Sequence, residues 1–207
     1  MASARLFFTC LITCSMFLLT FPCFAANQKV TLSLYYDTLS ISCATFIVKN
    51  LAKIFDDNLI TIFNLRLVPW GDVYANKSNN STAFCQHRPD QCKLNSLQSC
   101  AIDVMHDVNK HFALIYYIEF LAIEGRQKEW ETCFRSLGLP KKHILDCYNC
   151  SNATKLEQNY GNEIMHLNPP LEFVPWLVLN NQPTGNDYEN FAGYVCKAYK
   201  CKIVSMT

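Results

Sequence analysis

The sequence predicts an α/β domain that carries a cysteine-rich, largely helical insertion. Three observations lead to this fold class. A strand, a helix and a second strand follow one another near the beginning of the chain. Helical periodicity then fills a long middle region, and a short apolar strand followed by a helix ends the chain. The order β-α-β, helices, strand and helix is typical of one α/β domain with a helical insertion.

The first 25 residues have the three parts of a signal peptide. Arg5 is the only charge before Lys29, and residues 6–21 form an apolar or small-residue run. A break after Ala25 leaves small residues at the minus-one and minus-three positions. The run is shorter than the roughly 20 residues that span a bilayer, and no later segment is longer. We therefore expect residues 26–207 to form one domain in the secretory pathway, secreted or lysosomal/vacuolar, with no membrane span after signal removal.

The first elements of this domain follow from hydrophobic periodicity. Val30, Leu32 and Leu34 alternate with polar residues, which predicts a strand over residues 29–36. Apolar residues at three- and four-residue steps predict an amphipathic helix from Cys43 to about residue 58. Residues 59–68 are rich in Ile, Leu and Val and predict a second strand. Together these elements form a βαβ unit.

The rest of the domain is an insertion over about residues 70–165 and a closing strand and helix. The insertion begins with a polar, cysteine-bearing stretch to about residue 100, and helices are expected over 103–125, 127–137 and 141–150. A strand follows over 173–180, then a turn over 181–185 and a helix over 187–199. Proline lacks an amide hydrogen, so Pro175 should lie at the beginning or edge of its strand.

Charge and composition exclude several kinds of partner. The chain has 18 basic and 17 acidic residues, and loss of Arg5 with the signal leaves 17 of each. This balance, with no basic run, predicts no nucleic-acid partner. Cys147 and Cys150 have the Cys-x-x-Cys spacing, which would permit redox or zinc chemistry, but no strand precedes them and no second ligand pair follows. We therefore expect structural disulfides at these two residues, no metal and no cofactor.

Cysteine is the strongest compositional signal. Of 12 cysteines three lie in the signal peptide, so nine remain, and an odd number in an oxidising compartment leaves at least one thiol unpaired. We expect Cys43 to be that thiol. Five sequons agree with the secretory pathway and are expected glycosylation sites: Asn76, Asn79, Asn80, Asn149 and Asn152.

Residues 85–100 carry cysteine, glutamine, histidine and asparagine at six positions of fixed spacing, and residues 66–71 read Arg-Leu-Val-Pro-Trp-Gly. In these two segments the chain resembles one protein family, the gamma-interferon-inducible lysosomal thiol reductases (GILT proteins). The first segment matches the family signature, and the second resembles a strand-ending sequence of the family. Arg88 and Gln91 stand where the signature has glycine and glutamate. The six matching residues are Cys85, Gln86, His87, Cys92, Asn95 and Cys100.

The resemblance implies a thioredoxin-like fold and the reduction of protein disulfides. Family members carry Cys-x-x-Cys at the start of the first helix, whereas this chain has Ser40-Ile41-Ser42-Cys43. Ser40 therefore takes the position of the attacking cysteine, and Cys43 that of the resolving one. A hydroxyl is a far weaker acid than a thiol and forms no disulfide, so reductase activity should be weakened, monothiol or lost. Val174 and Pro175 are expected to line the substrate groove.

Two functions stay open at this point. The first is a thiol–disulfide oxidoreductase that acts on disulfide-containing polypeptides, with a small thiol as reductant. The second is a non-catalytic protein that binds polypeptides or partners with the same groove. Cys43 is either a single reactive thiol, a small buried core residue or half of a bridge to another cysteine. Disulfides are expected for the remaining cysteines, in a connectivity that the sequence leaves open: Cys133, Cys147, Cys150, Cys196 and Cys201.

Overall fold

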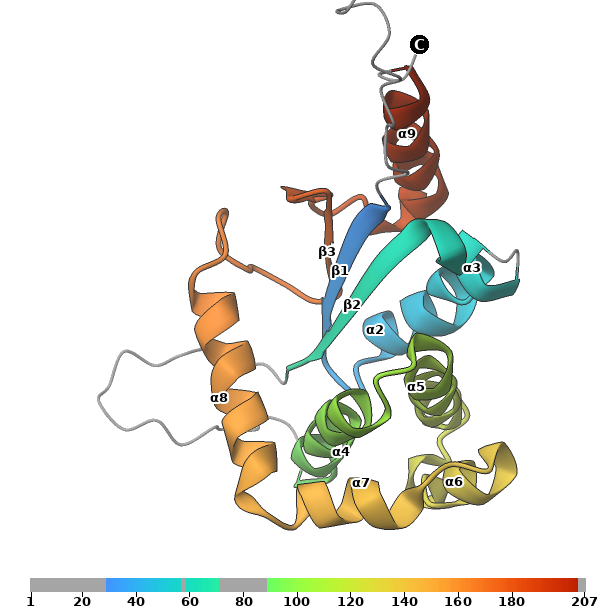
Figure 1. The fold of residues 1–207 in the computed structure, drawn as a ribbon, viewed down its shortest axis with the longest axis vertical. Helices are drawn as coiled ribbons and strands as arrows, with labels where there is room; N and C mark the ends of the chain where they lie inside the picture. Colours follow the sequence, from blue (N-terminus) through green and yellow to red (C-terminus); the bar gives the residue numbers. More distant parts are fainter. Residues whose placement is uncertain (1–28, 57–58, 71–88, 205–207) are drawn as a thin grey trace, which may run out of the picture.

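The protein is built on a four-stranded mixed sheet in the order β2-β1-β3-β4 (Figure 1). The structure is a computed structural model that describes residues 29–56, 59–70 and 89–204, except for the side chains of Pro89 and residues 198–204. The strands are β1 (Val30–Tyr36), β2 (Phe63–Pro69), β3 (Trp176–Leu179) and β4 (Gln182–Pro183). β1 pairs parallel with β2 and antiparallel with β3, so β1 lies in the interior of the sheet.

Period-two alternation directs the side chains of the sheet to two separate apolar cores. Leu34 of β1 lies beside Leu67 of β2 and Leu177 of β3, and all three belong to the larger core. The next residue, Tyr35, faces the opposite side with Trp176. Because successive side chains of a strand point to opposite faces, the alternation along β1 determines which side chains enter each of the two cores.

One face of the sheet is covered by the helix that follows β1. This helix consists of α2 (Ile41–Phe46), a π-helical segment (Ile47–Leu51) and α3 (Lys53–Asp56). α5 (Val108–Ile123) and α9 (Phe191–Val204) contribute to the same core. Phe46 of α2 packs edge-on against Phe191 of α9, with ring centroids 5.5 Å apart. These contacts fix the start of α2 relative to the end of β1.

The opposite face of the sheet is covered by α8 (Ser151–Met165), which stands apart from the other helices in Figure 1. Glu163 of α8 accepts hydrogen bonds from Tyr35 (2.8 Å) and from Arg66 Nε (3.0 Å). Arg66 also lies over the ring of Tyr160, 5.9 Å from its centroid. A half-buried ion pair and an aromatic contact therefore fasten α8 to the sheet.

The insertion has a third core of its own at the end of the sheet where β1 stops (Figure 1). Besides residues of α5, this core contains residues of α4 (Pro89–Met105), α6 (Thr132–Leu137) and α7 (Lys141–Tyr148). A disulfide between Cys100 of α4 and Cys147 of α7 crosses it. No helix of the described ranges is long and apolar enough to cross a membrane.

Most of the expected elements are confirmed, and several details differ from the prediction, among them the following. Residues 59–62 form a 3-10 turn rather than strand, because their side chains are not buried and β2 begins only at Phe63. Residues 89–100, the end of the polar stretch, belong to the helix α4. The helix expected over 103–125 is broken at His106, whose φ is 48°. α8 was not predicted at all, since its sequence is mostly polar with few apolar positions.

Candidate functional site

The site begins where β1 ends, in a short turn that leads into α2. Leu39 has a φ of 68°, and the amide of Ser40 donates to the carbonyl of Asp37 at 3.2 Å. The Ser40 carbonyl then accepts from Ala44 at 2.8 Å, the first hydrogen bond of the helix. Ser40 is therefore the N-cap residue of α2, although its side chain makes no capping hydrogen bond.

The Ser40 hydroxyl is connected through Ser42 to the loop before β3. It lies 3.0 Å from the hydroxyl of Ser42, which in turn donates to the carbonyl of Val174 at 3.4 Å. The Val174–Pro175 peptide bond is cis, and β3 begins directly after it, so the prediction that Pro175 lies at the beginning of its strand is confirmed. The fold thus brings together the two serines and the segment expected to line the groove, from sequence positions far apart.

Cys43 lies one turn into α2 and is completely buried in the larger core. The backbone amide of Asp37 approaches its sulfur at 3.5 Å. Burial raises the pKa of the Cys43 thiol to about 12, and this outweighs the hydrogen bonds from Asp37 and Ser40, which favour the thiolate. The thiol is unpaired, as expected, and of the three roles named above the environment is that of a small buried core residue.

A buried row of amide side chains on α4 holds the turn before Ser40. Asn95 donates to the carboxylate of Asp37 at 3.0 Å and accepts from the backbone of Thr38 at 3.0 Å. Gln91 donates to the other oxygen of the same carboxylate. Asn95, a position of the family signature, is therefore a support for the turn, because it satisfies a buried carboxylate and a buried amide together.

The row continues to Gln98, which links the turn to a buried acid on α5. Its carbonyl accepts from the Tyr36 hydroxyl at 2.5 Å, and its amide donates to Glu119 at 2.9 Å. Burial raises the pKa of Glu119 to about 8, against the opposing effect of the Gln98 amide. At acidic and neutral pH this carboxyl is therefore largely protonated.

Sequence reasoning missed Asp37, Gln91, Gln98 and Glu119 as parts of the site. The three amides of α4 follow one another at i, i+4 and i+7, which is the spacing of one helix face. That spacing was a usable signal, but it required α4 to be recognised as a helix. The carboxylates gave no signal, since single acidic residues in a turn and in an apolar helix have no characteristic spacing.

The cysteines of the insertion and of α9 differ from the prediction. Cys147 is bridged to Cys100, and Cys92 is disulfide-bonded. The expectation of disulfides at Cys133, Cys150 and Cys196 is wrong, because all three carry free thiols. Cys133 is buried in the insertion core, and burial raises the pKa of its thiol to about 11.

Several predicted residues lie outside the described residues, among them the signal peptide and the side chain of Cys201. The other such positions are Asn76, Asn79, Asn80, Cys85, Gln86 and His87. Asn149 and Asn152 are described and exposed, at the junction of α7 and α8. Within the described part of the chain, no group of three His, Cys, Asp or Glu side chains is arranged to hold a metal ion.

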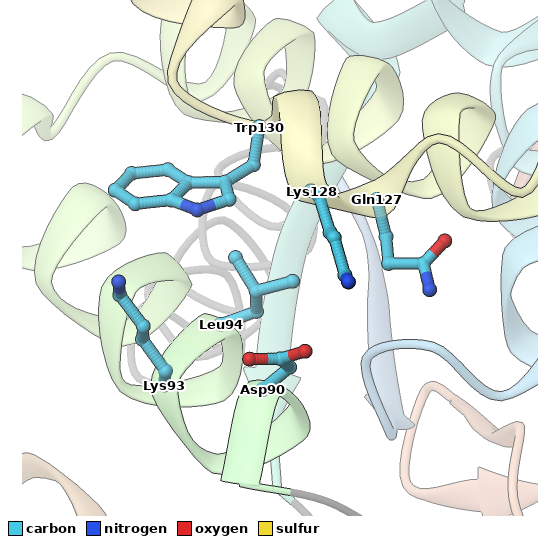
Figure 2. A pocket seen from close by; sticks show the side chains of 6 residues that line it. All are labelled: Asp90, Lys93, Leu94, Gln127, Lys128 and Trp130. Atoms are coloured by element: carbon cyan, nitrogen blue, oxygen red, sulfur yellow. The ribbon is translucent and has the colours of Figure 1, made fainter.

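A shallow pocket of about 150 Å³ lies on the insertion, and none of its lining residues belongs to the Ser40 site. Figure 2 shows Lys93 of α4 and Trp130 facing each other across it, and the ammonium lies 4.9 Å from the centroid of the indole. Ligand pockets have volumes of roughly 300–1,000 Å³. The pocket is therefore too small to mark a cofactor site.

Comparison with solved structures shows the fold. DsbA from Xylella fastidiosa superposes with a TM-score of 0.55 at 14% identity, covering 86% of this chain and 88% of that chain. Alpha-DsbA1 from Wolbachia pipientis gives a TM-score of 0.58 at 13% identity, covering 86% and 90%. At this identity the likeness shows a thioredoxin-like, DsbA-type fold, as expected from the sequence.

Comparison at the sequence level shows the family. Residues 31–137 match the family model described as gamma interferon inducible lysosomal thiol reductase (GILT). The gamma-interferon-responsive lysosomal thiol protein of Arabidopsis thaliana is 38% identical over 179 residues, which is 85% of this chain and 73% of that protein. The gamma-interferon-inducible lysosomal thiol reductase of Mus musculus is 26% identical, over 84% and 69%. The chain therefore belongs to the GILT family, whose kind of function is that of a thiol–disulfide oxidoreductase.

Proposed function

We propose that this protein is a GILT-family glycoprotein of the secretory pathway, secreted or lysosomal, that engages disulfide-containing polypeptides but has lost dithiol reduction. The observation that carries the proposal is the pair formed by Ser40 and Cys43. Ser40 stands at the start of α2, next to Ser42 and the Val174 segment, where an attacking thiol would have to be. Cys43 is the only sulfur that remains in the motif, and it is buried.

The chemistry of disulfide reduction explains the loss. In a dithiol mechanism a thiolate attacks one sulfur of the substrate disulfide, and the other substrate sulfur leaves as a thiol. The second enzyme thiolate then attacks the enzyme sulfur of the mixed disulfide, which releases the reduced substrate and leaves an enzyme disulfide. The Ser40 hydroxyl can take part in neither step, because oxygen forms no disulfide with Cys43.

A monothiol route through Cys43 meets a second obstacle. It would form a mixed disulfide between Cys43 and the substrate, and a small thiol such as glutathione would then have to release it. The thiolate is the nucleophile, and burial raises the pKa of Cys43 to about 12. Attack by Cys43 therefore requires that α2 first open, and turnover by this route should be close to the uncatalysed rate.

Restoring one sulfur atom tests the proposal. The Ser40→Cys variant should reduce a protein disulfide at least tenfold faster than the wild type, with a small thiol as the final reductant. Ser42→Cys is a matched control, because it adds a cysteine two positions further along, and the Ser42 hydroxyl lies 3.0 Å from that of Ser40. If Ser40→Cys stays as inactive as the wild type, or Ser42→Cys is equally active, then position 40 is not the attacking position.

Binding without reaction is the second candidate, and one observation favours it. Ile41, between Ser40 and Ser42, is 62% exposed, although it is a large apolar side chain at the start of α2. An exposed isoleucine at this position is suited to contact an apolar segment of a polypeptide. Ile41→Asp should therefore weaken binding of an unfolded polypeptide about tenfold, measured by fluorescence anisotropy at one salt concentration. Unchanged affinity would remove Ile41 from the binding surface.

A further inference from the structure

A disulfide and a free thiol lie next to each other in the insertion, at the junction between α7 and α8. Cys147 is bridged to Cys100 of α4. Cys150, three residues later, is exposed and carries a free thiol. The Cys150 sulfhydryl donates to the carbonyl of Cys147 at 3.1 Å, so thiol and disulfide belong to one turn.

The backbone of this turn is compatible with a bridge between its two ends. The Cys150 amide donates to the Cys147 carbonyl at 3.3 Å, which is the hydrogen bond of a four-residue turn. The first and last Cα atoms of such a turn lie less than about 7 Å apart. Disulfides join Cα atoms at roughly 4.4–6.8 Å, so a Cys147–Cys150 bridge requires little movement of the main chain.

Access determines which sulfur Cys150 can attack. Cys147 retains 7% of its surface, whereas Cys100 is completely buried. The other thiol of the insertion core, Cys133, is also completely buried, and its pKa is raised to about 11. Of the two described free thiols of the insertion, Cys150 is therefore the one with access to solvent, and Cys147 is the sulfur nearest to it in the chain.

We propose that residues 147–150 form a second thiol–disulfide exchange site, in which Cys150 displaces Cys100 from Cys147. The Cys150 thiol loses its proton to solvent, and its thiolate attacks the Cys147 sulfur. The Cys147–Cys150 bond forms, the Cys100–Cys147 bond breaks, and Cys100 leaves as a thiolate that takes up a proton. The numbers of disulfides and thiols are unchanged, so the step needs no oxidant and no reductant.

The exchange would change what holds α4 in place. In the Cys100–Cys147 form, α4 is covalently tied to α7, while its Asn95 holds Asp37 of the turn before Ser40 and its Gln98 holds Tyr36 at the end of β1. In the Cys147–Cys150 form the covalent tie between α4 and α7 is absent, and these two helices are held against each other by packing within the insertion core. The disulfide pairing of the insertion is thus connected to the Ser40 site by one helix, independently of whether that site reduces disulfides.

Peptide mapping distinguishes the two forms, because trypsin separates Cys100 from Cys147 and Cys150. Cys100 lies in residues 94–110, and Cys147 and Cys150 lie together in residues 143–155. The full-length mature protein is held under native conditions at a series of pH values. It is then acid-quenched, unfolded, alkylated with N-ethylmaleimide, freed of N-linked glycans and digested.

The expected result is conversion from one peptide pattern to another. At acidic pH the two peptides are joined and Cys150 is alkylated; at higher pH residues 143–155 carry an internal bridge and Cys100 is alkylated. The rate should rise about tenfold per pH unit in the acidic range, because the thiolate is the attacking species. Cys150→Ser should abolish the conversion, and Cys133→Ala, which removes the buried thiol, should retain it.

Three results would overturn the proposal. The first is that the two peptides stay joined at every pH, and the second is that conversion persists in Cys150→Ser. The third is a native bridge between Cys150 and Cys133, which would leave no thiol to exchange. None of these outcomes depends on reductase activity, so they are separate from the test of the Ser40 site.

Discussion

At the scale of single residues, the turn before α2 is held by hydrogen bonds between one buried carboxylate and amide side chains of α4. Asp37 lies in the turn before Ser40 with 3% of its surface exposed, and it is held by Gln91 and Asn95. Burying a carboxylate costs little free energy when hydrogen-bond donors surround it, and it costs a great deal when they do not. The amide at position 91 therefore matters, because the GILT signature that this segment resembles has glutamate there.

Gln91→Glu should make the stability of the protein depend on acid. The change replaces a donor to Asp37 by a second carboxyl group, and two buried carboxylates in contact raise the pKa of one of them. We expect a loss of about 2–3 kcal/mol in the free energy of unfolding at pH 7, most of it recovered near pH 4.5. Urea unfolding at both pH values measures this; an equal loss at both would show that charge is not the cause.

Glu119→Gln should remove a decline in stability between acidic pH and pH 8. Burial raises the pKa of Glu119 from 4.5 to about 8, so the folded state binds more protons than the unfolded state in this range. The contribution of Glu119 to the free energy of unfolding is therefore fully present below the pKa of its carboxyl in the unfolded state. It is lost as the pH rises through the pKa of the same carboxyl in the folded state. The variant should show a flatter profile in urea unfolding from pH 5 to pH 8. A profile parallel to that of the wild type would exclude Glu119 as its origin.

At the scale of elements, two contacts outside the site hold the surrounding structure together: that of α8 with the sheet, and the Cys100–Cys147 disulfide of the insertion. α8 packs on the sheet through Tyr160 and Gly161, and α4 is tied to α7 by Cys100 and Cys147. Neither contact includes Ser40 or Cys43. Changes there should affect stability first, and the site only through the turn that α4 supports.

Gly161→Ala should destabilise the contact between α8 and the sheet. A Cβ at this position would lie 2.8 Å from the ring of Trp70, closer than packed atoms allow. We expect a loss of about 1–3 kcal/mol, typical of overpacking, in thermal or urea unfolding. The matched control is Gly193→Ala on α9, whose Cβ would lie 2.5 Å from the amide oxygen of Asn190, a flexible side chain that can rotate away. Equal effects of the two substitutions would mean that the Trp70 ring moves aside with no loss in the free energy of unfolding.

Removing the disulfide should loosen the insertion more than the sheet. Cys100 and Cys147 are 47 residues apart, and closing a loop of that length stabilises a protein by about 4 kcal/mol in the chain-entropy model. The double Cys100→Ala, Cys147→Ala variant should unfold at lower urea concentration, and native-state hydrogen exchange should be faster in α4 than in β1. Faster exchange in β1 with unchanged exchange in α4 would contradict the prediction, because the disulfide would then stabilise the sheet rather than the insertion.

At the scale of the whole molecule, periodicity predicted the sheet better than the helical insertion. β1 and the helix after it were predictable because alternation and three-to-four spacing reflect burial on one face. α4 and α8 were not, since their apolar residues are few and several of their contacts to the sheet and to the turn are made by polar side chains, such as Asn95 of α4 and Glu163 of α8. For the site, the motif located Ser40, Cys43 and Pro175, but the buried support from α4 and α5 depends on tertiary contacts with no local pattern.

The pairing of the cysteines could not be predicted from the sequence either. Composition and compartment predicted that one thiol would stay unpaired, and Cys43 is unpaired in the structure. Pairing depends on which helices the fold places side by side, and α4 and α7 meet only after the insertion has formed its own core. The free thiols of Cys133 and Cys150 follow from that arrangement.

The rate of disulfide reduction by the unmodified protein tests the central claim most directly. Initial rates for the wild type and for Cys43→Ser are compared on one reducible protein disulfide, with glutathione present and a protein-free blank. With Ser40 unable to attack and Cys43 buried, both proteins should give the blank rate. A wild-type rate well above the blank that disappears in Cys43→Ser would contradict the account, because Cys43 would then be a working thiol.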